Sequence, residues 1–213
     1  MLGIVFAGGK GPPPELIRQI ISDLKTEALL AAADSGLELA EEAGLKPDWI
    51  IGDMDSLANP ARLEAYSPER IIRHSNEKDY SDTELAVDFL REKGCGEIWI
   101  AGGGGGRIDH LFAVRSLFER DFAPRRWISD TADIYRIEPC EKLSLSIASG
   151  AIVSVFPLGA GPWSASSAGL KWPLVNLPWN RGFFGLSNVA QNGEFMIHSL
   201  EGRFMVLMPY MSF

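Results

Sequence analysis

Residues 97–110 read EIWIAGGGGGRIDH, and this stretch decides the fold class. Its first residues form an apolar run suited to a buried strand, and a helical pattern begins at Ile108. A strand that passes through a glycine loop into a helix is the repeating unit of a parallel α/β sheet. Working outward, we expect further strands of the same kind at residues 2–6, 28–33, 49–51, 70–74 and 127–128.

Helical patterns occupy several of the segments between these strands. Apolar residues recur with helical spacing over residues 16–24, and a short helix at 36–43 is closed by Gly44. Residues 81–84 read SDTE, which is a capping box in front of a further helix with an apolar face. This β-α alternation predicts an N-terminal, mostly parallel sheet with helices on its faces.

The pattern changes after about residue 130. Apolar and polar residues alternate at 143–147, 195–197 and 204–208, and Gly, Pro, Asn and Ser separate these runs. A period of two residues indicates antiparallel strands with one buried face. We therefore expect an α/β domain over residues 1–133 and a small antiparallel β domain over residues 134–213.

The composition excludes several classes of protein. Hydrophobic residues make up 46% of the chain and charged residues 23%, which is typical of a globular protein. The formal net charge of -8 disfavours nucleic-acid binding. Cys95 and Cys140 belong to no metal-binding pattern and are expected to be reduced thiols. With no signal-like or membrane-spanning apolar segment, we expect a cytoplasmic protein without a membrane partner.

Acidic or glycine-rich loops follow four of the expected strands, at residues 33–36, 52–56, 76–82 and 102–110. In open α/β sheets, ligands bind in a crevice outside the carboxyl ends of the strands. We therefore expect these four loops to face one crevice, and this arrangement favours an active site over a chance grouping.

Three aspartates in these loops suggest a metal site. Asp53 and Asp55 are one residue apart, and Asp79 follows the next strand, so their carboxylates suit a magnesium ion that also contacts phosphates. The alternative for each residue is a helix cap or a turn. Asp82 already has such an explanation, because it lies in the first helical turn behind Ser81.

The glycine run suggests a phosphate site. Bare backbone amides at a helix N-terminus suit phosphate oxygens, and Arg107 adds charged donors. The alternative is a floppy glycine turn. Asp109 and His110 belong to the following helical turn, and His110 is assigned no catalytic role. The turn GGKG at residues 8–11 lacks the ending of a P-loop, so a nucleotide contact and a plain turn both remain open.

Six segments, taken together, resemble the thiamine pyrophosphokinase family, and they occur in the family's order across almost the whole chain. They are AADSG (32–36), PDWIIGDMDS (47–56), KDYSDTELA (78–86), GGGGGRIDH (102–110), GLKWPL (169–174) and GLSN (185–188). Two positions depart from the family pattern. Ser35 stands where a second glycine is usual, and Val189 stands where an acidic residue often follows Ser-Asn.

The resemblance implies an ATP- and magnesium-binding catalytic α/β domain followed by a thiamine-binding β-sandwich, acting as a homodimer with shared active sites. It implies transfer of diphosphate from ATP to the thiamine hydroxyl, with AMP leaving and Mg²⁺ as cofactor. The catalytic residues are expected to be Asp53, Asp55, Asp79, Arg107 and Asp109, the first three of which also bind the metal. The expected ATP-binding residues are Asp34, Ser35, Gly36, Asp82, Gly103, Gly105 and Gly106, and the thiamine-binding residues are Trp172, Ser187 and Asn188.

Three other functions stay open at this point. A related diphosphokinase that acts on a pterin-like alcohol would keep the acidic loops but would not need GLKWPL and GLSN. A nucleotidyltransferase built around the GGKG turn would release pyrophosphate instead of AMP. A non-catalytic nucleotide sensor has less need of three convergent carboxylates.

Overall fold

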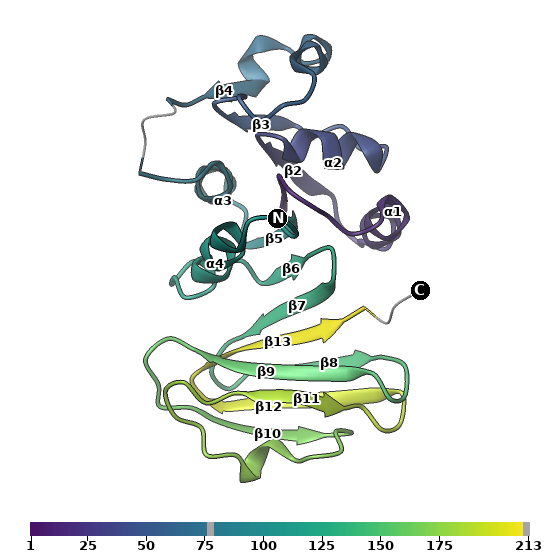
Figure 1. Ribbon diagram of the computed structural model, residues 1–213, viewed down its shortest axis with the longest axis vertical. Coiled ribbons are helices and arrows are strands. Elements are labelled where there is room, and N and C mark those ends of the chain that lie inside the picture. The colour runs from purple at the N-terminus through teal and green to yellow at the C-terminus, as the bar shows by residue number, and fades with distance from the viewer. Residues whose placement is uncertain (76–78, 211–213) are drawn as a thin grey trace. The chain divides into compact units, whose positions relative to one another are not determined.

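The computed structural model describes residues 1–75 and 79–210 and divides into two compact units, Met1–Asp130 and Thr131–Phe213 (Figure 1). The boundary expected after residue 133 lies slightly further along the chain, within strand β7 (Ala132–Ile137). Both cysteines are free, with Cys95 buried and Cys140 exposed. Among the described residues, no helix combines the length and the apolar character needed to cross a membrane.

The first unit is built on a parallel sheet with the strand order β6-β5-β1-β2-β3-β4. Its strands confirm the apolar runs predicted from the sequence. They are β1 (Leu2–Ala7), β2 (Ala28–Ala33), β3 (Trp49–Gly52), β4 (Ile71–Arg73), β5 (Glu97–Gly102) and β6 (Arg126–Ile128). In the register of the sheet, Ala7 pairs with both Ala33 and Gly102, so the loops after β1, β2 and β5 start at one edge.

Helices cover both faces of this sheet, as the β-α alternation predicts (Figure 1). On one face, Ile4 and Phe6 of β1 pack with Ile17 of α1 (Pro14–Ser22) and Leu39 of α2 (Gly36–Glu42). On the other face, a Cβ at Gly3 would lie 2.9 Å from Leu90 of α3 (Asp82–Glu92). The predicted capping box at the start of α3 is present, and α4 spans Ile108–Leu117. Two 3₁₀ helices, Pro60–Ala65 and Pro68–Arg70, were not predicted.

The strand order creates a switch point beside β1. The chain adds β2, β3 and β4 on one side of β1, and α3 then returns it to the other side, where β5 and β6 lie. The loops after β1 and β5 therefore lead to helices on opposite sides, which opens a crevice at the carboxyl ends of these strands.

The second unit contains two antiparallel sheets, ordered β11-β9-β13-β7 and β10-β12-β8. The predicted alternation is confirmed, because alternate residues such as Phe195, Ile197, Phe204 and Val206 are buried in a common core. The strands β7, β9, β10 and β11 lie outside the predicted runs. The remaining bounds are β8 (Lys142–Ser146), β9 (Ile152–Leu158), β10 (Ser164–Ala168), β11 (Gly185–Val189), β12 (Glu194–Glu201) and β13 (Arg203–Pro209), with a 3₁₀ turn at Leu174–Asn176.

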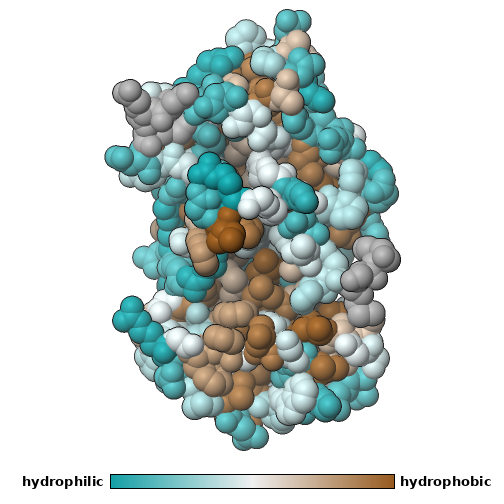
Figure 2. All heavy atoms as spheres, in the orientation of Figure 1, coloured by the Kyte–Doolittle hydropathy of each residue, from teal (hydrophilic) through white to brown (hydrophobic). Residues whose placement is uncertain are grey.

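Apolar side chains also reach the surface of the second unit. On the face seen in Figure 2 they gather over this unit, whereas hydrophilic side chains prevail over the first. Trp172, Val175 and Leu186 are at least half exposed. These residues come from the segment that joins β10 to β11 and from β11 itself, the region that contains both GLKWPL and GLSN.

Candidate active site

A crevice of about 660 Å³ lies at the carboxyl ends of the strands of the first unit. It is lined by the loops that follow β1, β2, β3 and β5 and by the first turns of α3 and α4. The lining residues are Gly8, Gly9, Lys10, Ala33, Asp34, Ser35, Ser56, Ser81, Asp82, Thr83, Gly103, Gly104, Gly105, Gly106, Arg107 and His110. The sequence-based expectation of a crevice at this edge therefore corresponds to a real concavity.

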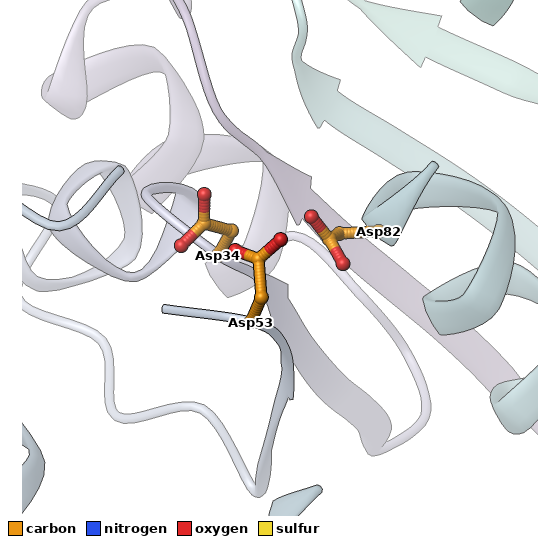
Figure 3. Close-up of side chains that lie close together, drawn as sticks. All are labelled: Asp34, Asp53 and Asp82. Atoms are coloured by element: carbon orange, nitrogen blue, oxygen red, sulfur yellow. The ribbon is translucent and has the colours of Figure 1, made fainter. Parts of the chain in front are cut away.

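Three carboxylates converge beside this crevice (Figure 3). Asp34, Asp53 and Asp82 each place one carboxylate oxygen within 4.8 Å of the other two. They come from the loop after β2, the loop after β3 and the first turn of α3. Such a cluster suits a divalent cation, because like charges this close destabilise one another unless a positive charge neutralises them.

The surroundings of the Asp34 carboxylate indicate whether the cluster is suited to bind a metal ion. Its side chain is buried, and its Oδ1 has no hydrogen-bond partner within the described residues. Burial raises the pKa of Asp34, and the nearby charges of Asp82, Asp53 and Asp55 raise it further, against the lowering effect of a hydrogen bond with Ser56. A buried, unpartnered oxygen beside two other carboxylates is the donor set that a hard cation such as Mg²⁺ takes.

The backbone around the cluster is held in uncommon conformations. Gly52 has a φ of 145°, and a Cβ there would lie 3.0 Å from Cγ of Asp82 and 3.2 Å from Cβ of Asp34. Asp34 and Met54 have φ values of 48° and 67°, in the left-handed region that non-glycine residues rarely occupy. Asp53 Oδ1 also accepts a hydrogen bond from the Asp55 amide at 3.2 Å. Strain concentrated in this way is typical of functional sites.

The geometric cluster shares only Asp53 with the metal-binding set expected from the sequence. Asp55 is exposed, and its Oδ1 accepts a hydrogen bond from the Ser56 hydroxyl at 3.0 Å. Asp79 is exposed and lies outside the cluster; residues 76–78, which include Lys78 of the matched motif, are outside the described residues. Asp34 and Asp82 were expected to bind ATP. Asp34 lies near Asp53 because β2 pairs with β3, whereas Asp82 reaches them from the first turn of α3.

The five-glycine loop is a structured wall of the crevice. Gly103, Gly105 and Gly106 have φ values of 69°, 66° and 65°, which a side chain would strain. The loop is also tied to the turn after β1, because the Lys10 amide donates to Gly104 O at 2.7 Å and the Gly104 amide donates to Lys10 O at 2.8 Å. These bonds disfavour the floppy-turn interpretation. They also join the GGKG turn, left open by the sequence, to the crevice.

Arg107 and Asp109, both expected to be catalytic, form an ion pair with each other. The Arg107 Nε and Nη2 donate to the two Asp109 oxygens at 3.1 Å and 2.5 Å. This pairing lowers the pKa of Asp109 and raises the pKa of Arg107. Both side chains are mostly exposed, so an incoming phosphate can compete with Asp109 for the guanidinium.

Ser35 and Gly36 are accommodated by their neighbours on the β1 side. The Ser35 hydroxyl oxygen lies 2.3 Å from the position that a Cβ on Gly8 would take. Gly8 therefore leaves room for the serine that stands where the family usually has glycine. Gly36 begins α2 against the backbone of β1, where a Cβ would lie 1.9 Å from Phe6 O.

The three expected thiamine-binding residues lie in the second unit and differ in their surroundings. Asn188 is buried, its Oδ1 accepts the Trp172 amide at 3.1 Å, and its Nδ2 donates to Trp172 O at 2.6 Å. The Trp172 ring is half exposed, and the Lys171 ammonium lies 4.7 Å from its centroid. Ser187 is exposed with a φ of 57°. Asn188 thus holds the backbone of the exposed tryptophan, while the Trp172 ring and Ser187 face solvent.

Comparison with known proteins adds independent information. Residues 22–124 match the family model described as thiamin pyrophosphokinase, catalytic domain. Thiamine pyrophosphokinase of Bacillus subtilis (strain 168) is 28% identical over 177 residues, which cover 81% of each chain. Thiamine pyrophosphokinase 1 of Oryza sativa subsp. japonica is 29% identical over 168 residues, covering 72% of this chain and 63% of the plant protein.

Solved structures share the fold over nearly the whole chain. The crystal structure of thiamine pyrophosphokinase from Bacillus subtilis superposes with a TM-score of 0.79 at 23% identity and covers 99% of both chains. Thiamin pyrophosphokinase from Geobacillus thermodenitrificans gives a TM-score of 0.76 at 24% identity, covering 100% of this chain and 99% of that one. In its catalytic-domain match and its sequence relatives the chain is similar to the thiamine pyrophosphokinases, and it shares their two-unit fold.

Proposed function

We propose that this protein transfers the diphosphate group of ATP to the hydroxyl of thiamine, giving thiamine diphosphate and AMP. The observation that carries the proposal is the convergence of three carboxylates beside two glycine loops in one crevice of a chain that is similar to this family. Diphosphate transfer needs charge neutralisation and alignment of the reactants more than it needs a protein nucleophile. Carboxylates, backbone amides and cations around one crevice meet that need.

The proposed cofactor is Mg²⁺, with Asp53 as a ligand. Asp53 belongs both to the motif set with Asp55 and Asp79 and to the geometric set with Asp34 and Asp82. A divalent ion held there would neutralise negative charge on the phosphates. The buried Asp34 oxygen favours the geometric set.

The remaining residues would bind and align the substrates. Amides of Gly103, Gly105 and Gly106 would donate to phosphate oxygens, and Arg107 would stabilise the charge that develops during transfer. Asp109 is the substrate-side carboxylate of the matched motif. Trp172 offers an aromatic wall for the aminopyrimidine and cationic thiazolium rings of thiamine, beside Ser187.

Arg107→Ala is expected to raise the KM for ATP about tenfold and to lower kcat, with thiamine binding little changed. The reason is that Arg107 lines the crevice, where its guanidinium can leave the ion pair with Asp109 and bind a phosphate instead. Steady-state kinetics with each substrate varied will measure this effect. Arg115→Ala is the control, because it breaks an ion pair between Arg115 of α4 and Glu119, and neither residue lines the crevice. Values within about twofold of wild type would make Arg107 merely a surface charge.

Trp172→Ala is expected to raise the KM for thiamine roughly tenfold, consistent with losing about 1–2 kcal/mol of stacking, with the KM for ATP unchanged. Val175→Ala serves as the control, because Val175 is an exposed apolar residue of the same segment. Asn188→Asp should have a similar effect, since it removes the donor to Trp172 O. Equal thiamine kinetics in Trp172→Ala and Val175→Ala would contradict the assignment.

One assay separates the proposed function from its alternatives. The protein is incubated with ATP, Mg²⁺ and a panel of alcohols, and the nucleotide products are identified. AMP that forms only with thiamine supports the proposal, and AMP that forms with a pterin-like alcohol instead would favour the related diphosphokinase. Release of pyrophosphate would indicate a nucleotidyltransferase, and the absence of any product would indicate a nucleotide sensor.

We also propose that the protein acts in the cytoplasm as a homodimer whose active sites are shared between the two copies. This proposal rests on the family resemblance, and sedimentation of the purified protein tests the dimer. Mixing an Asp53→Asn subunit with a Trp172→Ala subunit tests the shared site, because one intact site should reappear in each heterodimer. A fully active monomer, or a mixture whose kcat/KM for thiamine is no higher than that of the Trp172→Ala parent, would contradict it. Nucleic acid is not a proposed partner, given the net charge of -8.

A further inference from the structure

The turn at residues 8–11 is part of the crevice wall. Gly8, Gly9 and Lys10 line the crevice, and Lys10 pairs with Gly104 through two backbone hydrogen bonds of 2.7 Å and 2.8 Å. The pairing is an isolated antiparallel bridge between segments almost a hundred residues apart in the sequence. We infer that Lys10 binds the phosphate chain of the nucleotide, an inference that rests on the proposed use of ATP.

The geometry of the bridge directs the Lys10 side chain across the five-glycine loop. A Cβ on Gly105 would lie 2.6 Å from both Cγ and Cδ of Lys10. The aliphatic stem therefore passes over the backbone of Gly105, in the space that any side chain there would occupy. Similarly, a Cβ on Gly9 would lie 2.7 Å from Gly104 O. Glycine at both positions lets the two loops approach closely enough for the lysine stem to lie on the loop.

The charged groups around the crevice indicate that the Lys10 ammonium is available to bind phosphate. Asp34 and Asp82 contribute negative charge to the crevice, and Arg107 is paired with Asp109. Lys10 is exposed and forms no ion pair with residues 1–75 or 79–210. An ammonium on a flexible stem beside bare amides is suited to phosphate oxygens, which it meets as a point charge. Lys10 thus supplies a second phosphate-binding cation on the side of the crevice formed by the turn after β1.

The decisive measurement is calorimetric binding of inorganic tripolyphosphate, ATP, AMP and adenosine to the full chain in the presence of Mg²⁺. Lys10→Met keeps the stem and removes the charge, whereas Lys10→Arg keeps the charge. Lys25→Met is the matched control, because Lys25 is an exposed lysine outside the crevice. We expect Lys10→Met to weaken ATP and tripolyphosphate binding about tenfold, to weaken AMP binding less and to leave adenosine binding unchanged. Lys10→Arg should retain most of the affinity.

Two outcomes would overturn the inference. One is ATP and tripolyphosphate affinities in Lys10→Met equal to those in Lys25→Met. The other is an equal loss for adenosine and ATP, which would mean that the turn shapes the nucleoside pocket instead of binding phosphate. These readouts are independent of turnover, so failure of the thiamine reaction in the wild-type assay remains distinguishable from failure of the Lys10 inference.

Discussion

Asp53→Asn is expected to lower kcat/KM at least about a hundredfold while leaving the melting temperature unchanged or slightly higher. Asparagine keeps the oxygen that accepts the Asp55 amide, so the turn after β3 should persist. It removes one of three negative charges that lie within 4.8 Å of one another, which relieves repulsion in the folded protein. The negative charge of Asp53 therefore has two opposite effects: it helps to bind a cation, and without a cation it destabilises the folded protein. Turnover across a magnesium titration and thermal unfolding without metal measure the two effects.

Matched variants decide which carboxylates share the role of Asp53. Asp23→Asn, at an exposed position after α1, is the control and should behave as wild type. If the geometric cluster holds the ion, Asp82→Asn should reduce activity as severely as Asp53→Asn, and Asp55→Asn should reduce it less. The opposite order would favour the motif set. Near-normal turnover of Asp53→Asn at ordinary magnesium would reject a metal site at Asp53 altogether.

Much of the first unit could be predicted because its signals are local. The runs at residues 28–33 and 98–101 are apolar on both faces, as a central parallel strand requires, and the capping box at Ser81 fixes the start of α3 within one residue. In the second unit, the sequence did not predict β7, β9, β10 or β11. The segment of β10 reads SASSA and carries little hydrophobic signal, although Ala165 is buried in the core through tertiary contacts.

The site was harder to predict because its decisive contacts are long-range. Asp82 has a complete local explanation as a first-turn acid, and that explanation hides its approach to Asp34 across the sheet edge. The bridge between Lys10 and Gly104 depends on the pairing of β1 with β5. The motif predicts that Asn188 binds a ligand, but its side chain forms two hydrogen bonds with the backbone of Trp172. Local sequence patterns identify residues with suitable side chains, but the order of the strands in the sheet determines which of these residues lie close together.

The second large effect concerns Gly36, where the first turn of α2 packs against the end of β1. The three atoms nearest to a Cβ placed on Gly36 are main-chain atoms: Phe6 O at 1.9 Å, Phe6 C at 2.5 Å and Ala7 N at 3.0 Å. No side-chain rotation can relieve this overlap, so α2 itself would have to move away from the sheet. Asp34 and Ser35 immediately precede the helix and would move with it.

Gly36→Ala is therefore expected to lower the free energy of unfolding by about 3 kcal/mol and the melting temperature by roughly 10 °C. It should also weaken ATP binding, because the displaced turn carries two crevice residues, Asp34 and Ser35. Gly44→Ala is the control: Gly44 has a φ of 71° but no atom within 4 Å of an added Cβ, so only backbone strain of about 1 kcal/mol is expected. Denaturant unfolding followed by tryptophan fluorescence, with ATP binding measured in parallel, compares the two. Equal losses of stability would mean that α2 adjusts easily and that close packing at Gly36 does not position the Asp34 turn.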